Sequence, residues 1–232
     1  VKAFELSSFE NMVKRLKRLD SYIVCCDSAN NSKDLYERLE DKNIKIITGE
    51  INKNESMKDL NLDYHPKLIF SPKIIYGCDS SLYGRPVFCY YRGNTINPVE
   101  MYQQVSRVRS ITNIYYYFSH SIKGKRQYQK LEDVNKNNSV LEQWIKEKYD
   151  INLIENDKIT DLIQEIKNLY IFQDDIFNEN VILNFEKILK KKGISVYKSK
   201  FKAKNKQSKD RKENLKEYHN SIFDAEQNII NE

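Results

Sequence analysis

The chain has 232 residues, of which 40% are hydrophobic and 31% charged. This composition allows a packed core, and we expect part of the chain to lie outside that core. No apolar run approaches the ~20 residues that span a bilayer, and no signal peptide opens the chain, so we expect no membrane partner and an intracellular location, cytoplasmic or nuclear. The net charge is +6, and residues 198–217 alone carry nine Lys or Arg against three Asp or Glu. This placement predicts a contact surface for a polyanion near the C-terminus.

The four cysteines, Cys25, Cys26, Cys78 and Cys89, lie among apolar residues. None has the C-x2-C spacing of a zinc site, and neighbouring cysteines on a strand point to opposite faces. We therefore expect buried, reduced thiols and no metal site.

In chain order, the first elements alternate between helix and strand. Apolar positions predict a helix over residues 9–19, and "YIVCCD" (22–27) is a strand. A second helix is expected over residues 31–43 with Ser32 as its N-cap, and "IKIIT" (44–48) is the next strand.

After a polar loop the alternation continues. Strands are predicted at 67–71, 85–93 and 113–119. A helix at 98–107 begins with a capping box in which Asn97 is the N-cap and Glu100 the third helical residue. Apolar strands that alternate with helices indicate parallel strands covered on both faces, so residues 1–122 are expected to form one α/β domain with a sheet of about five strands.

Beyond residue 123 the pattern changes to helical spacing, as in Leu162, Ile166 and Leu169. We expect a helical extension over 123–196, with a short strand near its end, and a basic tail over 197–232 that is partly disordered or helical. Lysines of the tail, Lys200, Lys202 and Lys204, are candidates for nucleic-acid phosphates, beside aromatic rings that stack on bases. The alternative is a solubilising end.

Polar residues follow several strands, at positions where α/β sheets bind ligands. Thr48 and Ser71 each follow a strand, and Gly77 permits a tight turn before Asp79. A hydroxyl and a carboxylate at one sheet edge can bind a phosphate and a ribose or a magnesium-bound water. The alternative is a turn in which Asp79 satisfies only local backbone groups.

The segment "MYQQVSRVRS" (101–110) places Gln103, Arg107 and Arg109 just before the last predicted strand of the domain. We expect the arginines at the edge that holds Ser71 and Asp79, where guanidinium groups can grip a transferring phosphoryl group. The alternative is an ion pair with Glu100 or Asp79, which contributes ~0–1 kcal/mol.

Together, these pieces resemble the second RecA-like domain of superfamily 2 helicases, most closely the herpesvirus-type replication origin-binding helicases and their relatives in large DNA viruses. The resemblance covers about residues 20–120. "YIVCCDS" is similar to motif IV, "LIFSPKIIYGCD" to motif V, and "QQVSRVRS" to motif VI, Q-x-x-G-R-x-x-R. The resemblance implies a RecA-like parallel sheet flanked by helices.

It also implies roles for single residues. Arg107 would be the finger that reaches the γ-phosphate of ATP. Gln103 would lie near the nucleotide or couple to the partner domain, and Asp79 would contact the ribose or the magnesium–water network. Ser71 would contact a DNA phosphate, and Gly77 and Arg109 would lie on the nucleotide side. The sequence departs from the pattern at two positions: Ser106 replaces the usual Gly, and Ser110 stands where the second arginine falls, with Arg109 one position earlier.

The chain contains no G-x-x-x-x-G-K-[ST] loop and no D-E-x-x box. We therefore expect no ATPase activity from this chain alone, and use of ATP with Mg²⁺ only together with a first RecA-like domain, in cis or in trans. Two rival hypotheses remain: a noncatalytic nucleic-acid-binding module that kept the RecA-like fold, and an unrelated α/β enzyme acting on a phosphorylated small molecule.

Overall fold

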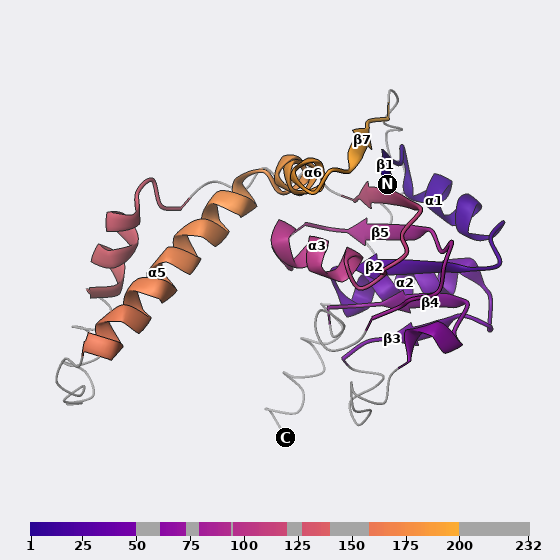
Figure 1. The fold of residues 1–232 in the computed structure, drawn as a ribbon, viewed down its shortest axis with the longest axis horizontal. Coiled ribbons are helices and arrows are strands. Elements are labelled where there is room, and N and C mark those ends of the chain that lie inside the picture. Colours follow the sequence, from indigo (N-terminus) through magenta and orange to yellow (C-terminus); the bar gives the residue numbers. More distant parts are fainter. Residues whose placement is uncertain (50–60, 73–78, 94, 120–126, 140–157, 200–232) are drawn as a thin grey trace, which may run out of the picture.

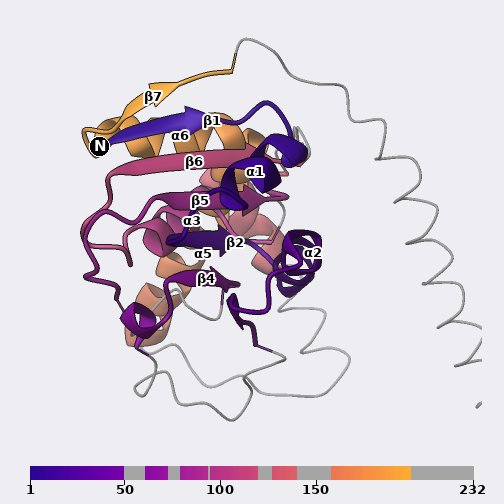
Figure 2. The same ribbon diagram turned by 90° about the vertical axis from the view of Figure 1, so that its right-hand side faces the viewer.

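The computed structural model describes residues 1–49, 61–72, 79–93, 95–119, 127–139 and 158–199. Seven parallel strands form one sheet in the order β3-β4-β2-β5-β6-β1-β7 (Figure 1). The strands are β1 (Lys2–Glu5), β2 (Tyr22–Cys26), β3 (Lys45–Ile47), β4 (Lys67–Phe70), β5 (Val87–Tyr91), β6 (Asn113–Phe118) and β7 (Ser195–Tyr197). Figure 2 shows the strands stacked from β7 to β4.

Helices cover both faces of this sheet. α1 (Phe9–Leu16) and α2 (Ala29–Leu39) lie on one face, and α3 (Pro98–Val105) and α6 (Val181–Lys191) lie on the other. The chain also has α5 (Lys158–Glu179) and a short 3-10 helix, η2 (Leu62–Tyr64), before β4. Residues 131–139 are also helical. No helix in the described part of the chain is long and apolar enough to cross a membrane.

Two hydrophobic clusters lie on the opposite faces of the sheet. One joins α3 and α6 to alternate strand residues such as Cys25, Cys89 and Tyr91. The other joins α1 and α2 to the residues between them, such as Cys26 and Tyr90. Because successive side chains of a strand point to opposite faces, the fully buried strands β2 and β5 must be apolar throughout. The predicted fold class, an α/β domain built on a parallel sheet flanked by helices, is confirmed.

Strand number and one helix start differ from the prediction. The sheet has seven strands rather than about five, since β1 pairs with β6 and β7 pairs with β1, both beyond the same end of the expected set. The short strand expected near the end of the helical extension is present as β7.

The second helix begins after Ser28, whose side chain accepts a hydrogen bond from the Asn31 amide, so the prediction of Ser32 as N-cap is wrong. Ser32 instead donates back to the Ser28 carbonyl within the first turn.

The C-terminal helices divide into a part on the sheet and a part that leads away from it. α6 packs on α3, and Glu186 of α6, although buried, accepts a hydrogen bond from Tyr116 of β6. α5 extends away from the sheet (Figure 1), with Asp174 held by the side chain of Asn97. Leu162, Ile166 and Leu169 share the predicted helical spacing on α5, yet each is more than half exposed. The predicted division at residues 122 and 196 stays a prediction.

The thiols described here are free and buried, namely Cys25, Cys26 and Cys89. Cys25 and Cys89 lie opposite each other on β2 and β5. Burial raises the pKa of the Cys25 and Cys26 thiols well above the ordinary value, so they stay protonated and inert. This confirms the prediction for these three; Cys78 lies outside the described residues.

Candidate functional site

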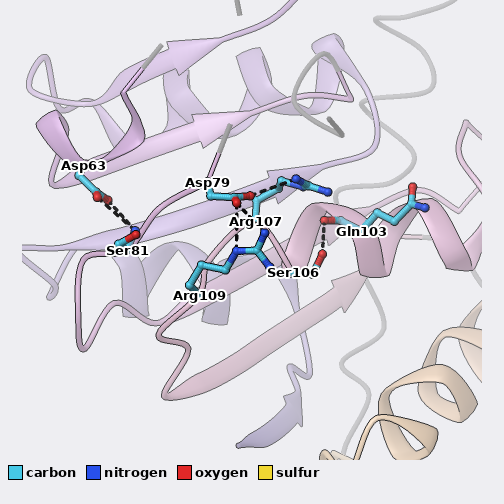
Figure 3. A network of polar contacts seen from close by, with 7 residues as sticks. All are labelled: Asp63, Asp79, Ser81, Gln103, Ser106, Arg107 and Arg109. Atoms are coloured by element: carbon cyan, nitrogen blue, oxygen red, sulfur yellow. Dashed lines mark hydrogen bonds and ion pairs between the residues drawn. The ribbon is translucent and has the colours of Figure 1, made fainter. Parts of the chain in front are cut away.

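Asp79 is the centre of a polar cluster that contains both predicted arginines. Its Oδ1 accepts a hydrogen bond of 3.0 Å from Nη1 of Arg107, and its Oδ2 accepts one of 3.0 Å from Nε of Arg109 and a second from Nη2 of Arg109. Figure 3 shows the two guanidinium groups converging on the one carboxylate. The Asp79–Arg107–Arg109 cluster therefore carries two positive charges and one negative charge.

A backbone bridge brings these residues together from positions 28 and 30 apart in the chain. Ser80 and Val108 form a parallel β-bridge: the Ser80 amide donates to the Arg107 carbonyl at 2.7 Å, and the Arg109 amide donates to the Ser80 carbonyl at 2.8 Å. Val108 is buried between the two arginines, so they project on the other side, toward Asp79. The juxtaposition of the two predicted motifs is thus fixed by the main chain.

Exposure distinguishes the two arginines. The Arg107 side chain is 19% exposed and the Arg109 side chain 58% exposed. Nε of Arg107 is buried and has no hydrogen-bond partner among the described residues. A partly buried guanidinium with donors to spare is the better equipped of the two to bind an incoming anion, because less of its binding is lost to water.

Arg85, which the sequence reasoning missed, holds the loop that carries this cluster. It is 1% exposed and donates to four backbone carbonyls: Nη1 to Leu62, and Nη2 to Tyr22, His65 and Pro66. Burial lowers the pKa of Arg85 below its ordinary value, and the nearby carboxylate of Asp63 opposes that shift. The only sequence signal was a charged residue at the first position of the strand predicted at 85–93.

Asp63 is a second support that the sequence reasoning missed. It accepts hydrogen bonds from the Ser80 hydroxyl at 2.6 Å and from the Leu82 amide. It also accepts one from the Ser81 amide (Figure 3). Partial burial alone would raise the pKa of Asp63, but these hydrogen bonds hold it below the ordinary value. Asp63 thereby fixes the residue next to Asp79. Its signal was the sequence "NLDYH", in which Asn61 caps the short 3-10 helix.

The cluster lies at the edge of the sheet where the strands begin. Arg85 touches the carbonyls just before β4 and at the start of β2, and Ser80 contacts Arg85 and Asp63 there. α3 starts beyond the end of β5 and runs ~12 Å back toward the edge where the strands begin. A connection between parallel strands must return in this way, and the Ser80–Val108 bridge follows the helix. Residues that follow α3, including Arg107 and Arg109, therefore lie at the edge where the strands begin, which we call the starting edge.

Ser71 and Thr48 lie at the opposite edge, where strands end. The Ser71 amide donates to the carbonyl of Ile47, the last residue of β3. The prediction that Ser71 shares one edge with the arginines is therefore wrong. Ser71 is 3% exposed and Thr48 is fully buried, so neither offers much surface to a phosphate in this conformation. Their contacts with nucleic acid stay predictions.

Gln103 also lies apart from the cluster. α3 ends at Val105 with Ser106 as C-cap, so Arg107 is not on a helical face with Gln103. The Gln103 side chain points away from Asp79 in Figure 3 and lines a hollow between α3 and α5 with Tyr170 and Phe177. Its neighbour Gln104 is buried, where it donates to the Cys26 carbonyl and accepts from the Tyr91 hydroxyl.

The capping box that starts α3 is confirmed. Asn97 accepts hydrogen bonds from the amides of Val99 and Glu100, and Glu100 accepts one from the Asn97 amide. Glu100 is thus occupied at the start of the helix, and of the two ion-pair partners considered for the arginines, Asp79 is the one observed. Gly77 and the tail lysines Lys200, Lys202 and Lys204 lie outside the described residues.

Comparisons with known proteins give a likeness in structure but none in sequence. No family model matches the chain. No curated protein matches it either. Among solved structures, the chain is similar to the C-terminal domain of the DEAD-box protein Dbp5, at 14% identity and a TM-score of 0.35, over 65% of this chain and 86% of that one. A likeness of this size says nothing about activity, which must be inferred from the site itself.

Proposed function

We propose that this chain is the second RecA-like module of an ATP-dependent nucleic-acid helicase and that Arg107 supplies the arginine finger. The observation that carries the proposal is the Ser80–Val108 bridge, which places Arg107 and Arg109 around Asp79 as a preformed cationic cluster. The finer assignment, to a DNA helicase of the replication origin-binding type from a virus, rests on the motif resemblance alone.

Arg107 fits a γ-phosphate better than Arg109 does. It is the more buried of the two, and Asp79 holds it through one terminal nitrogen. A phosphate bound in the interdomain cleft would compete with Asp79 for this guanidinium or take up its remaining donors. Arg109, more exposed and held by two nitrogens, would support the charge of the site.

Asp79 is best understood as a positioning residue. Both of its oxygens accept hydrogen bonds from arginines, which leaves it poorly suited to bind a metal directly. Among the residues that the structure describes, no three His, Cys, Asp or Glu side chains form a metal-binding group. The magnesium that accompanies ATP would therefore be held by the first RecA-like domain. A contact of Asp79 with the ribose or the magnesium-bound water network stays a prediction.

The experiment measures ATP hydrolysis when this chain acts together with its first RecA-like domain, in cis or in trans. Arg107→Ala should still bind ATP but hydrolyse it roughly 10³-fold more slowly, because an arginine finger contributes 10³ to 10⁵ in rate. Arg109→Ala is the matched control and should lose much less. Normal turnover by Arg107→Ala would refute the finger assignment.

One observation favours the alternative, a noncatalytic nucleic-acid-binding module. Arg107 and Arg109 both pair with Asp79 within the chain, as the members of a structural ion-pair network do. In that case ATP would change neither the affinity for nucleic acid nor its salt dependence. A nucleic-acid affinity that ATP leaves unchanged in the assembled protein, together with the absence of ATP hydrolysis, would favour the module over the helicase.

A further inference from the structure

A second basic site lies at the same edge of the sheet but on the face covered by α1. A cavity of about 630 Å³ opens between the end of α1 and the starts of β5 and β6. Lys14, Arg15 and Arg18 line it from the helix side, and Thr112, Asn113 and Tyr115 line it from β6 and the residue before it. We call it the α1 pocket. It shares no residue with the Asp79–Arg107–Arg109 cluster.

The α1 pocket holds three cations and no acidic lining residue. Within the described part of the chain, Lys14 and Arg18 make no ion pair, and both are exposed. By contrast, Lys17 of the next turn lies 3.5 Å from Glu40, outside the pocket. Cations near a helix C-terminus stabilise the helix dipole by ~0.3–1 kcal/mol. That effect accounts for basic residues there, but not for their gathering around a hollow.

Two aromatic side chains, Phe88 and Tyr115, form the floor of the α1 pocket beside these charges, and the row of rings to which they belong continues outside it. Phe88, Tyr115, Phe4 and Tyr197 lie in register on β5, β6, β1 and β7, with ring centroids 4.9, 5.5 and 5.2 Å apart in that order. The Arg15 guanidinium lies over the Tyr115 ring, 5.3 Å from its centroid, and Arg15 also donates to Asn11. The α1 pocket therefore combines aromatic lining with positive charge.

We propose that the α1 pocket binds a phosphate group together with the flat ring attached to it, the chemistry shared by a free nucleotide and a single nucleic-acid strand. Lys14 and Arg18 would meet the phosphate, and Arg15 with Tyr115 would contact the ring by stacking and cation–π interaction. The cavity lies within the ~300–1,000 Å³ range of small-molecule sites. This binding is independent of the arginine finger, because the two sites have no residue in common.

The test measures binding of two probes to the full chain without Mg²⁺: a fluorescein-labelled oligothymidylate 20-mer and a fluorescent ATP analogue. The variant Lys14→Ala/Arg18→Ala should lose ~10-fold in affinity for the probe that occupies the pocket. Its control is Lys17→Ala/Lys190→Ala, which removes the same charge from exposed residues outside the pocket and should change affinity less than ~2-fold. For a strand, the salt slope should fall by about 1.4, since each phosphate contact contributes about 0.7.

The outcomes separate the two sources. A loss for the 20-mer alone assigns a nucleic-acid strand, and a loss for the ATP analogue, competed by AMP better than by inorganic triphosphate, assigns a nucleotide. Equal affinity of the two double variants for both probes would overturn the proposal. Thermal unfolding of both variants checks folding, which we expect to be unchanged because all four side chains are exposed.

A photocrosslink locates the strand independently of the basic tail. A 20-mer carrying 5-iododeoxyuridine should crosslink to the peptide that contains Tyr115, and Lys14→Ala/Arg18→Ala should reduce that product. Crosslinks confined to residues 198–232 in the unmodified chain would show that the tail alone binds the strand, and would overturn the strand assignment even if the double variant lost affinity.

Discussion

The two basic sites at the starting edge of the sheet differ in how their charges are balanced. In the Asp79–Arg107–Arg109 cluster one carboxylate engages two guanidinium groups, whereas the α1 pocket has three cations and no carboxylate among its lining residues. Both lie at this edge because α1 and α3 each run back from the strand ends. In the first, an anion must compete with Asp79 or use the arginine donors that remain, whereas in the second no carboxylate competes with an anion.

The largest expected effect comes from removing the support that only the first site has. Arg85→Leu leaves the carbonyls of Leu62, Tyr22, His65 and Pro66 without this donor and should lower the free energy of unfolding by ~3–5 kcal/mol. Urea denaturation measures it. The control Arg18→Leu, in the α1 pocket, should stay within ~0.5 kcal/mol. Equal effects of the two would contradict the difference between the sites.

A smaller effect is expected from making the first site resemble the second. Asp79→Asn removes the carboxylate charge shared by Arg107 and Arg109, so the cluster gains one net positive charge. The free energy of unfolding should fall by only ~1 kcal/mol, because the pairs are partly exposed. Affinity for the 20-mer should rise about threefold and become more salt-dependent. Unchanged affinity would show that Arg107 and Arg109 are not accessible to a polyanion even when unpaired.

The smallest effect is expected at Asp63, where pH is the variable. Because its folded-state pKa is below the ordinary value, Asp63 adds stability above the unfolded pKa of about 3.9, and this is lost as pH falls through the folded pKa. Asp63→Asn should therefore lower the free energy of unfolding by ~0.5 kcal/mol at pH 7, and by progressively less below pH 4. Urea denaturation between pH 2.5 and 7 measures this. A gap that persists at the lowest pH would rule out the carboxylate charge as its cause.

Local patterns predicted most of the fold. Strands such as β2 and β5 are apolar on both faces, and the capping box at Asn97 marks the start of α3, so both could be identified from neighbouring residues alone. The predicted cap, Ser32, lies four residues beyond the observed cap, Ser28, and only the backbone conformation distinguishes the two serines. A strand was predicted at β7 but not at β1, and the position of neither in the sheet was predicted. These strands of four and three residues gain their stability by pairing with β6 and with each other, which neighbouring residues do not reveal.

The candidate site was predicted by residue type but not by position. The Asp79 pairing was one of the alternatives considered, and the structure adds the Ser80–Val108 bridge that enforces it. The roles of Arg85 and Asp63 could not be predicted, because their partners include backbone groups of other segments, which no local spacing reveals.

The sequence by itself determined the alternation of strand and helix, the burial of the thiols and the polar residues around Arg107. Tertiary structure decided which of those residues meet. α3 carries Arg107 to the starting edge and leaves Ser71 at the ending edge, because a crossover between parallel strands must return along the sheet. The α1 pocket arises in the same way, since its cations and its aromatic floor come from separate segments that only the folded sheet brings together.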